Sequence, residues 1–365
     1  MITAAIFPGR YIQGPGAIVR LQKLIPRFGT KGLLIVSPSG YDTIYPEIRS
    51  ALEGSVSVVA EKIGRECCDE EIARLKEAAG SNACDIIVGI GGGKTIDTAK
   101  VVAHELNVPV IIVPTIASTD APCTGLAVIY RQETGTIKRV VFPRRNPDVV
   151  LVDTQIIADS PVRFLVAGMG DALATWFEAE SCMRKYAKTM TRERGTLTAY
   201  TLSHLCYMTL LEYGVAAKRA CKANVVTPAL EHVVEATTLL SGIGAESGGL
   251  GAAHALHDGL NALDATHAYY HGEKVAFGLL ASLFLTDKPK GTIDEVYSFC
   301  ESVGLPTTLA GLGLADASDA MLMKAATIAS GEKQTIHNER VPISPAAVLA
   351  ALRAADIEGI SRRDG

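Results

Sequence analysis

Three short segments in the part of the sequence after residue 160 contain residues that could bind a metal ion together. Asp171 follows two closely spaced glycines, His254 lies in a run of small residues, and His271 precedes a glycine. One carboxylate and two imidazoles form a three-ligand set that leaves a coordination position open, as expected of a catalytic zinc site. The long separations along the chain say little, because the tertiary structure decides such geometry.

Each of these residues also has an ordinary structural interpretation. Asp171 could cap the N-terminus of a helix, and His254 could be a core histidine whose hydrogen bonds are satisfied. His271 could cap a helix or lie exposed, and His257, one helical turn after His254, could support the site or lie at the surface. The metal site is indicated by the three residues as a set.

A run of three glycines in the first half indicates a phosphate-binding turn. A buried strand pattern over 85–90 leads into glycines 91–93, and a helical pattern begins at once with Lys94. Glycines permit positive φ and let backbone amides approach a ligand, and a helix N-terminus favours an anion such as a pyrophosphate. Asp97 could cap this helix, or hold a ribose or a backbone amide. The alternative is a tight turn without a ligand, since the run matches neither a Walker A loop nor Gly-x-Gly-x-x-Gly.

The segment 114–124 follows the next strand pattern and is rich in small hydroxyl side chains. Ligands bind at the carboxyl ends of strands in open α/β sheets, so this segment is a second candidate for ligand contact. By itself it is equally well explained as a loop bounded by prolines.

The elements that must position these residues differ between the two halves of the chain. Strand and helix patterns alternate up to about residue 160, which predicts an α/β domain with a mostly parallel sheet covered on both faces. The expected strands are 33–36, 56–60, 85–90, 109–114 and 149–152, and the expected helices are 69–79 and about 94–106. From 161 to 365 apolar residues recur at helical spacing, which predicts a second, all-α domain with Pro161 in its first helical turn. The predicted domains are therefore 1–160 and 161–365.

Composition excludes several classes of protein. The chain has 35 Lys and Arg against 39 Asp and Glu, a net charge of −4, which disfavours a general nucleic-acid binder. No apolar run is long enough for a membrane span, and the N-terminus does not resemble a signal peptide. Eight scattered cysteines without a Cys-x-x-Cys pair fit a reducing compartment. We expect a cytoplasmic protein that contacts neither nucleic acid nor membrane.

The sequence resembles the glycerol dehydrogenases of the metal-dependent, iron-containing-type alcohol dehydrogenase superfamily over essentially its whole length. Four motifs carry this resemblance as a set: Gly-Gly-Gly-Lys-Thr-Ile-Asp-Thr-Ala-Lys, Pro-Thr-Ile-Ala-Ser-Thr-Asp-Ala-Pro-Cys, Gly-Asp-Ala-Leu-Ala-Thr-Trp-Phe-Glu-Ala and His-Gly-Glu-Lys-Val-Ala-Phe-Gly. The resemblance implies a Rossmann-like N-terminal domain, a helical C-terminal domain of the dehydroquinate synthase-like architecture, an active site in the cleft between them, and a homo-oligomer.

The resemblance also implies which residues act. It places a metal ion on Asp171, His254 and His271, and Asp120 near the nicotinamide and the substrate hydroxyls. Iron-binding members have a histidine four residues after the aspartate, where this chain has Thr175, so the resemblance favours zinc. The NAD contacts that it implies are Gly92, Gly93, Lys94, Asp97, Thr115, Ser118, Thr124, Leu126, Val128 and Tyr130.

The implied activity is the reversible, NAD-linked oxidation of glycerol, or of a related vicinal diol, to dihydroxyacetone or the hydroxy ketone. Glycerol-1-phosphate dehydrogenase and 3-dehydroquinate synthase-like activity are alternatives on the same fold, and a non-enzymatic binding protein is a third. The chain departs from the family pattern in having no carboxylate at Ser37 or Ser39, which predicts relaxed exclusion of NADP. It also has Ala245 where the family commonly has Phe, which predicts room for a larger diol.

Overall fold

The computed structural model describes residues 2–64 and 66–364, which form two compact units. The sheet unit consists of the described residues within 7–161 together with 220–231. The helical unit consists of residues 2–6, 162–219 and 232–364. The chain thus passes from the sheet unit into the helical unit directly after Pro161, and this proline precedes the helix instead of lying inside its first turn.

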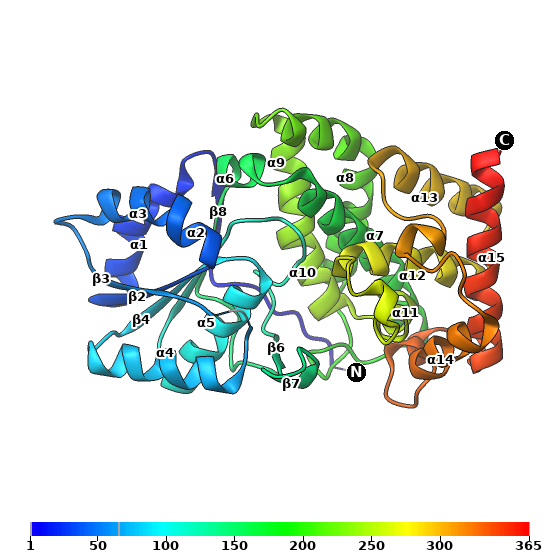
Figure 1. Ribbon diagram of the computed structural model, residues 1–365, viewed down its shortest axis with the longest axis horizontal. Helices are drawn as coiled ribbons and strands as arrows, with labels where there is room; N and C mark the ends of the chain where they lie inside the picture. The colour runs from blue at the N-terminus through cyan, green and yellow to red at the C-terminus, as the bar shows by residue number, and fades with distance from the viewer. Residues whose placement is uncertain (1, 65, 365) are drawn as a thin grey trace. The chain divides into compact units, whose positions relative to one another are not determined.

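A six-stranded parallel sheet forms the centre of the sheet unit, with the strand order β1-β8-β5-β4-β2-β3 (Figure 1). The predicted α/β fold with a parallel sheet is confirmed, and the sequence patterns located five of the six strands. The strand that they missed is β1, whose four residues include a glycine and a glutamine and carry no apolar run. The strands are β1 (Tyr11–Gly14), β2 (Lys31–Val36), β3 (Ser57–Lys62), β4 (Ile86–Gly91), β5 (Val110–Pro114) and β8 (Val149–Asp153).

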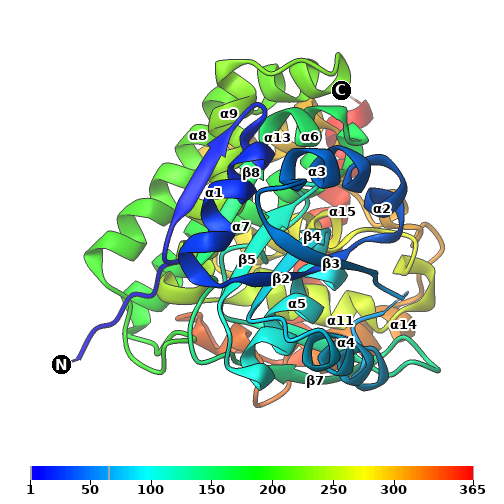
Figure 2. The ribbon, with the colours of Figure 1, turned by 90° about the vertical axis from the view of Figure 1, so that its left-hand side faces the viewer.

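Helices cover both faces of this sheet (Figure 2). On one face, alternate strand residues such as Leu33 and Ile87 pack with α4 and α5. On the other, Leu34 and Val88 pack with η1, α1 and α3. Burial of both faces explains why the strands are continuous apolar runs. The helices of this unit are η1 (Ala17–Arg20), α1 (Leu21–Phe28), α2 (Pro38–Thr43), α3 (Tyr45–Leu52), α4 (Asp69–Ser81), α5 (Gly93–Leu106) and α6 (Thr154–Asp159).

A separate antiparallel hairpin follows the loop after β5 and was not predicted from the sequence. It consists of β6 (Ala127–Tyr130) and β7 (Ile137–Val141). Ala127 and Ile129 are buried in the core beneath α4 and α5, whereas Val128 and Tyr130 alternate with them and are half-buried. The hairpin was missed because β7 is mostly exposed and contains two basic residues.

The second unit is built from helices, as predicted (Figure 1). Its helix α12 packs against α7, α11 and α15, so it is the central element. Two segments, η2 (Ala236–Leu240) and η3 (Gly244–Gly248), are π-helical turns. The other elements are α7 (Val162–Lys185), α8 (Leu197–Lys222), α9 (Pro228–Glu235), α10 (Ser241–Ile243), α11 (Ala252–Asn261), η4 (Asp264–Thr266), α12 (His271–Leu285), α13 (Lys290–Val303), η5 (Ala310–Leu312), α14 (Asp319–Ala329), η6 (Thr335–Asn338) and α15 (Pro345–Asp364), with the end of α8 and the start of α9 counted in the sheet unit.

In the described part of the chain, none of the helices combines the length and apolar character that a membrane crossing requires. All eight cysteines are free thiols, seven of them buried.

Candidate metal and cofactor sites

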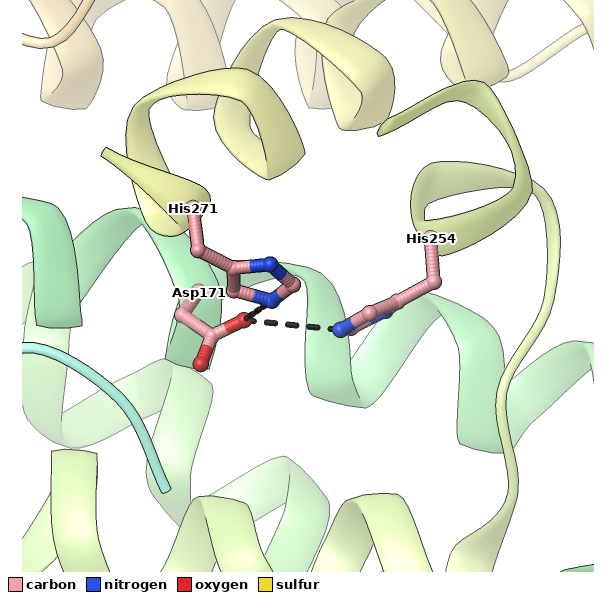
Figure 3. A group of neighbouring side chains, drawn as sticks. All are labelled: Asp171, His254 and His271. Atoms are coloured by element: carbon pink, nitrogen blue, oxygen red, sulfur yellow. Dashed lines mark ion pairs between the residues drawn. The ribbon is translucent and has the colours of Figure 1, made fainter. Parts of the chain in front are cut away.

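Asp171, His254 and His271 converge in the helical unit (Figure 3). They come from the middle of α7, the first turn of α11 and the first residue of α12. Asp171 Oδ1 lies 3.1 Å from His271 Nε2 and 3.4 Å from His254 Nε2, and one candidate ligand atom from each residue lies within 4.8 Å of the other two. The interpretation of Asp171 as a helix cap is wrong, because nine helical residues precede it in α7.

Close packing of α7 and α12 brings Asp171 and His271 together. A Cβ at Gly272 would lie 1.8 Å from the carbonyl oxygen of Ala167, and one at Gly170 would lie 2.4 Å from that of Gly272. Real Cβ atoms do not come so close, so only glycines allow the two helices to approach this far. The glycines beside Asp171 and His271 therefore set the helix crossing that aligns the two side chains.

Glu178 orients His254. It lies two helical turns after Asp171 on the same face of α7 and is buried. Its Oε1 accepts hydrogen bonds from the backbone amides of Gly251 and His254, at 2.9 and 3.0 Å, and its Oε2 lies 2.7 Å from His254 Nδ1. A carboxylate only accepts, so Nδ1 carries a proton, and Nε2, which faces Asp171, is the nitrogen with which the neutral ring would bind a metal.

A similar chain of contacts orients His271. Its Nδ1 lies 3.0 Å from His257 Nε2, and His257 Nδ1 lies 3.1 Å from Asp258 Oδ1. With the Asp258 carboxylate as the final acceptor, His257 donates from Nδ1 and accepts from His271 at Nε2. Burial, with His271 beside it, lowers the pKa of His257 to about 3, so its ring is neutral at pH 7. His271 Nε2, which faces Asp171, is thus the nitrogen with which this ring would bind a metal.

This arrangement fits a bound cation. Asp171 Oδ1 is buried without a hydrogen-bond partner, and the Nε2 atoms of two imidazole rings are directed at it. Burial by itself would raise the pKa of Asp171, but the two histidines hold this pKa well below its usual range. Burial also opposes ionisation of His254, but Glu178 and Asp171 raise the pKa of that ring well above its usual value. The site favours positive charge among these atoms, and a divalent metal on one oxygen and two nitrogens would supply it.

In the sheet unit, the glycine run forms the turn from β4 into α5, as predicted. None of its three glycines has positive φ, so the left-handed backbone that glycine permits is not used here. Close packing explains Gly91 and Gly92: a Cβ on Gly91 would lie 2.6 Å from Thr95 Oγ1, and one on Gly92 would lie 2.9 Å from Ile116 Cδ1. A Cβ at Gly93 would contact nothing within 4 Å. The open space at Gly93, on the first residue of α5, is where a ligand could approach the backbone.

Two polar residues of this turn already have partners within the sheet unit. Lys94 Nζ pairs with Glu66. Asp97 Oδ2 accepts a hydrogen bond of 2.9 Å from the amide of Val128, and its Oδ1 lies 3.1 Å from Lys100 Nζ. Of the three roles considered for Asp97, the structure contains the contact with a backbone amide.

The other predicted cofactor residues lie on the segment between β5 and β6 and on β6 itself. The amide of Thr115 donates to the carbonyl of Gly91, at 3.1 Å, so this segment starts beside the glycine turn. Ser118 and Asp120 are half-buried and Thr124 is buried. Further along, three half-buried residues alternate with buried ones and share one side of the chain: Leu126, Val128 and Tyr130.

Comparison with known proteins identifies the family. Residues 8–154 match the family described as iron-containing alcohol dehydrogenase. The chain is 58% identical to a glycerol dehydrogenase of Thermotoga maritima over 364 residues, with all of both chains covered. It belongs to the iron-containing alcohol dehydrogenase family. This family member is also 48% identical to a glycerol dehydrogenase of Escherichia coli, with 96% of each chain covered. A crystal structure of a probable glycerol dehydrogenase from Sinorhizobium meliloti superimposes with a TM-score of 0.92, at 40% identity and 99% coverage of both chains.

The sequence resemblance and the predicted enzyme class are therefore confirmed: the chain is an oxidoreductase of the alcohol dehydrogenase class. Sequence reasoning missed Glu178 as a supporting residue, although its position two helical turns after Asp171 was a usable signal. It named His257 only as one of two open possibilities, and the structure places it against His271. It gave no role to Lys100, which the structure buries.

Proposed function

We propose that this protein catalyses the reversible, NAD-linked oxidation of glycerol, or of a related vicinal diol, to dihydroxyacetone or the corresponding hydroxy ketone. The observation that carries the proposal is the convergence of Asp171, His254 and His271 on one point, with an orphaned buried carboxylate oxygen at its centre. The full-length similarity to glycerol dehydrogenases supports the substrate class.

We propose that these three residues hold a divalent metal. When bound, the metal supplies Lewis-acid activation of a substrate hydroxyl, and NAD accepts the hydride. The protein's own contribution is orientation: Glu178 fixes the ring of His254, and the contact with His257 fixes the ring of His271. A three-residue site leaves coordination positions for substrate oxygen.

We propose zinc as the metal. On α7, residue 175 lies one helical turn after Asp171, where iron-binding relatives are expected to have a histidine. Thr175 is buried there, and its Oγ1 lies 3.0 Å from Ser241 Oγ. This side chain is therefore engaged within the protein and adds no nitrogen ligand, which supports a three-residue site suited to zinc.

We propose that the cofactor binds at the glycine turn. Its pyrophosphate would meet the backbone of Gly92 and Gly93 at the N-terminus of α5, where helix amides are free to bind an anion. The segment carrying Thr115, Ser118 and Thr124, together with Leu126, Val128 and Tyr130, would contact the rest of the dinucleotide. Asp120 is the proposed orienting group for the substrate hydroxyls. Lys94 would have to exchange its partner Glu66 for a phosphate.

A substrate that carries a phosphate is less well supported. Such a substrate needs cationic side chains near the metal, and the ligand-bearing segments offer mainly Lys274. That lysine is buried, and its Nζ donates to Asn261 Oδ1 at 2.5 Å. Burial also lowers its pKa. These observations favour an uncharged polyol over glycerol 1-phosphate or the substrate of 3-dehydroquinate synthase.

The proposal is tested with metal-free protein to which zinc or ferrous iron is returned. NADH formation would be followed with glycerol, 1,2-propanediol, 2,3-butanediol and glycerol 1-phosphate as substrates, and NADH consumption with dihydroxyacetone. We expect turnover with the uncharged diols after addition of zinc. No turnover of any diol by folded protein that contains bound metal would contradict the proposal, and a preference for glycerol 1-phosphate would favour the alternative. We further propose that the protein is cytoplasmic and forms a homo-oligomer, as the resemblance implies. Light scattering of the purified protein would measure its oligomeric state.

A further inference from the structure

Lys100 is a lysine that the proposed reaction does not use. It lies on α5 and is 3% exposed, within a stretch of that helix that is buried from Thr95 to Ala103. An ammonium group is strongly disfavoured in such a position unless its charge is paired and its donors are satisfied. The surroundings of its Nζ therefore indicate what the residue does.

Four oxygen atoms surround Lys100 Nζ. The ammonium donates to the carbonyl of Ala121 at 3.0 Å, to that of Thr124 at 3.3 Å, and to that of Leu126. The fourth is Asp97 Oδ1, at 3.1 Å. Three backbone carbonyls from one short segment thus turn inward to a single positive charge, as they would around a bound cation.

Asp97 adds a second attachment to the same segment. Its Oδ2 accepts the amide of Val128 at 2.9 Å, while its Oδ1 pairs with Lys100, one helical turn away on α5. One turn of α5 therefore fixes the segment 121–128 at four backbone positions. The same helix begins at Gly93, so the segment and the glycine turn are attached to one rigid element.

We propose that Lys100 is a positioning residue for the dinucleotide. Its ammonium holds the segment 121–128 in the shape that presents Thr124, Leu126 and Val128 beside the glycine turn. A segment that is ordered before binding does not lose conformational freedom when the cofactor arrives, so affinity is higher. The inference rests on the proposed function, because it takes these three residues as cofactor contacts.

The experiment compares Lys100→Met with Lys76→Met. Methionine fills the same space without donors or charge, and Lys76 is a matched control in the sheet unit, with an exposed ion pair to Glu105 at 2.8 Å. Calorimetric titration would measure the Kd for NADH, and hydrogen exchange would measure protection of residues 121–128. We expect the Kd to rise about tenfold in Lys100→Met, equivalent to about 1.4 kcal/mol, with faster exchange in this segment and unchanged metal content. Lys76→Met should match the parent in all three measurements.

Lys100→Gln keeps a hydrogen-bond donor without the charge and provides a second variant if Lys100→Met does not fold. We expect its Kd and its exchange rates to lie between those of the parent and of Lys100→Met. A folded Lys100 variant that binds NADH as tightly as the parent would overturn the positioning role, whatever its stability. Failure of the parent itself to bind NADH or NADPH would contradict the proposed function, so the two failures are distinguishable.

Discussion

Glu178 binds His254 twice, through the ring Nδ1 at 2.7 Å and through the backbone amide at 3.0 Å. The first contact fixes the tautomer and rotation of the ring, and the second fixes the helix turn from which the ring projects. Orientation of a candidate metal ligand and capping of its helix are therefore combined in one buried carboxylate on α7.

The substitution Glu178→Gln should weaken metal binding without removing a ligand. An amide in place of the carboxylate can present its NH₂ group to Nδ1, which does not hold the proton there. The amide also lacks the negative charge that makes Nε2 a stronger electron-pair donor to a metal. We expect zinc affinity, measured by competition with a chelator, to fall about 10–100-fold. Glu180→Gln on the same helix is the control, because Glu180 pairs with Arg184 and Lys288 and not with the cluster. Equal zinc affinity in both variants would argue against the orienting role.

Removal of a proposed ligand should have a larger effect. Asp171→Ala and His254→Ala each take away one donor atom, so bound zinc and diol oxidation should be lost together. We expect metal affinity to fall more than about 100-fold, beyond the effect of outer partners. Metal analysis after dialysis checks this result, with His204→Ala, an exposed histidine on α8, as the control. Stoichiometric zinc in both ligand variants would mean that the metal binds elsewhere.

Gly272→Ala tests the packing that joins Asp171 to His271. The new Cβ would lie 1.8 Å from the carbonyl oxygen of Ala167, so α12 must move away from α7. We expect a loss of about 1–3 kcal/mol in the free energy of unfolding and weaker metal binding. Fluorescence of Trp176, the single tryptophan, reports unfolding of the helical unit. Gly291→Ala in α13, where a Cβ contacts nothing within 4 Å, should leave both quantities near the parent's; a similar loss there would show that the effect is not specific to the crossing.

Gly93→Ala separates cofactor binding from folding. A Cβ at this position contacts no protein atom within 4 Å, and the residue does not have positive φ, so stability should be kept. A methyl group would nevertheless obstruct a phosphate that approaches the helix N-terminus, and we expect the Kd for NADH to rise roughly tenfold. Gly80→Ala in α4, also open, should bind NADH like the parent. Unchanged affinity in Gly93→Ala would place the pyrophosphate elsewhere.

The residues that follow β2 predict that NADP, as well as NAD, supports turnover. β2 pairs with β4, and the space for a Cβ on Gly91 lies 2.8 Å from Ser37 Cβ, so this strand ends beside the glycine turn. The residues that follow β2 include no carboxylate before Asp42 to repel a 2′-phosphate, and Asp42 pairs with Lys62 at 3.1 Å. We expect Ser39→Asp to lower kcat/KM for NADP about tenfold with little change for NAD. Strict dependence of the parent on NAD would contradict the prediction.

The sequence alone determined five strands of the parallel sheet, the glycine turn and the three candidate ligands, because strand runs, helical spacing and metal-ligating residue types are local properties. Only the tertiary structure decided which residues meet. Asp171 and His254 are far apart in the sequence. The distance of 3.4 Å between Asp171 Oδ1 and His254 Nε2 depends on how α7 and α11 pack. The glycines show the same distinction: the run 91–93 stands out in the sequence as a turn between a strand and a helix, whereas the need for Gly272 arises from the close approach of α12 to α7. The roles of Glu178 and Lys100 could not be predicted from the sequence, because a charged residue in a helix is ordinarily exposed. Only the tertiary structure shows that both side chains are buried beside the groups that they hold in place.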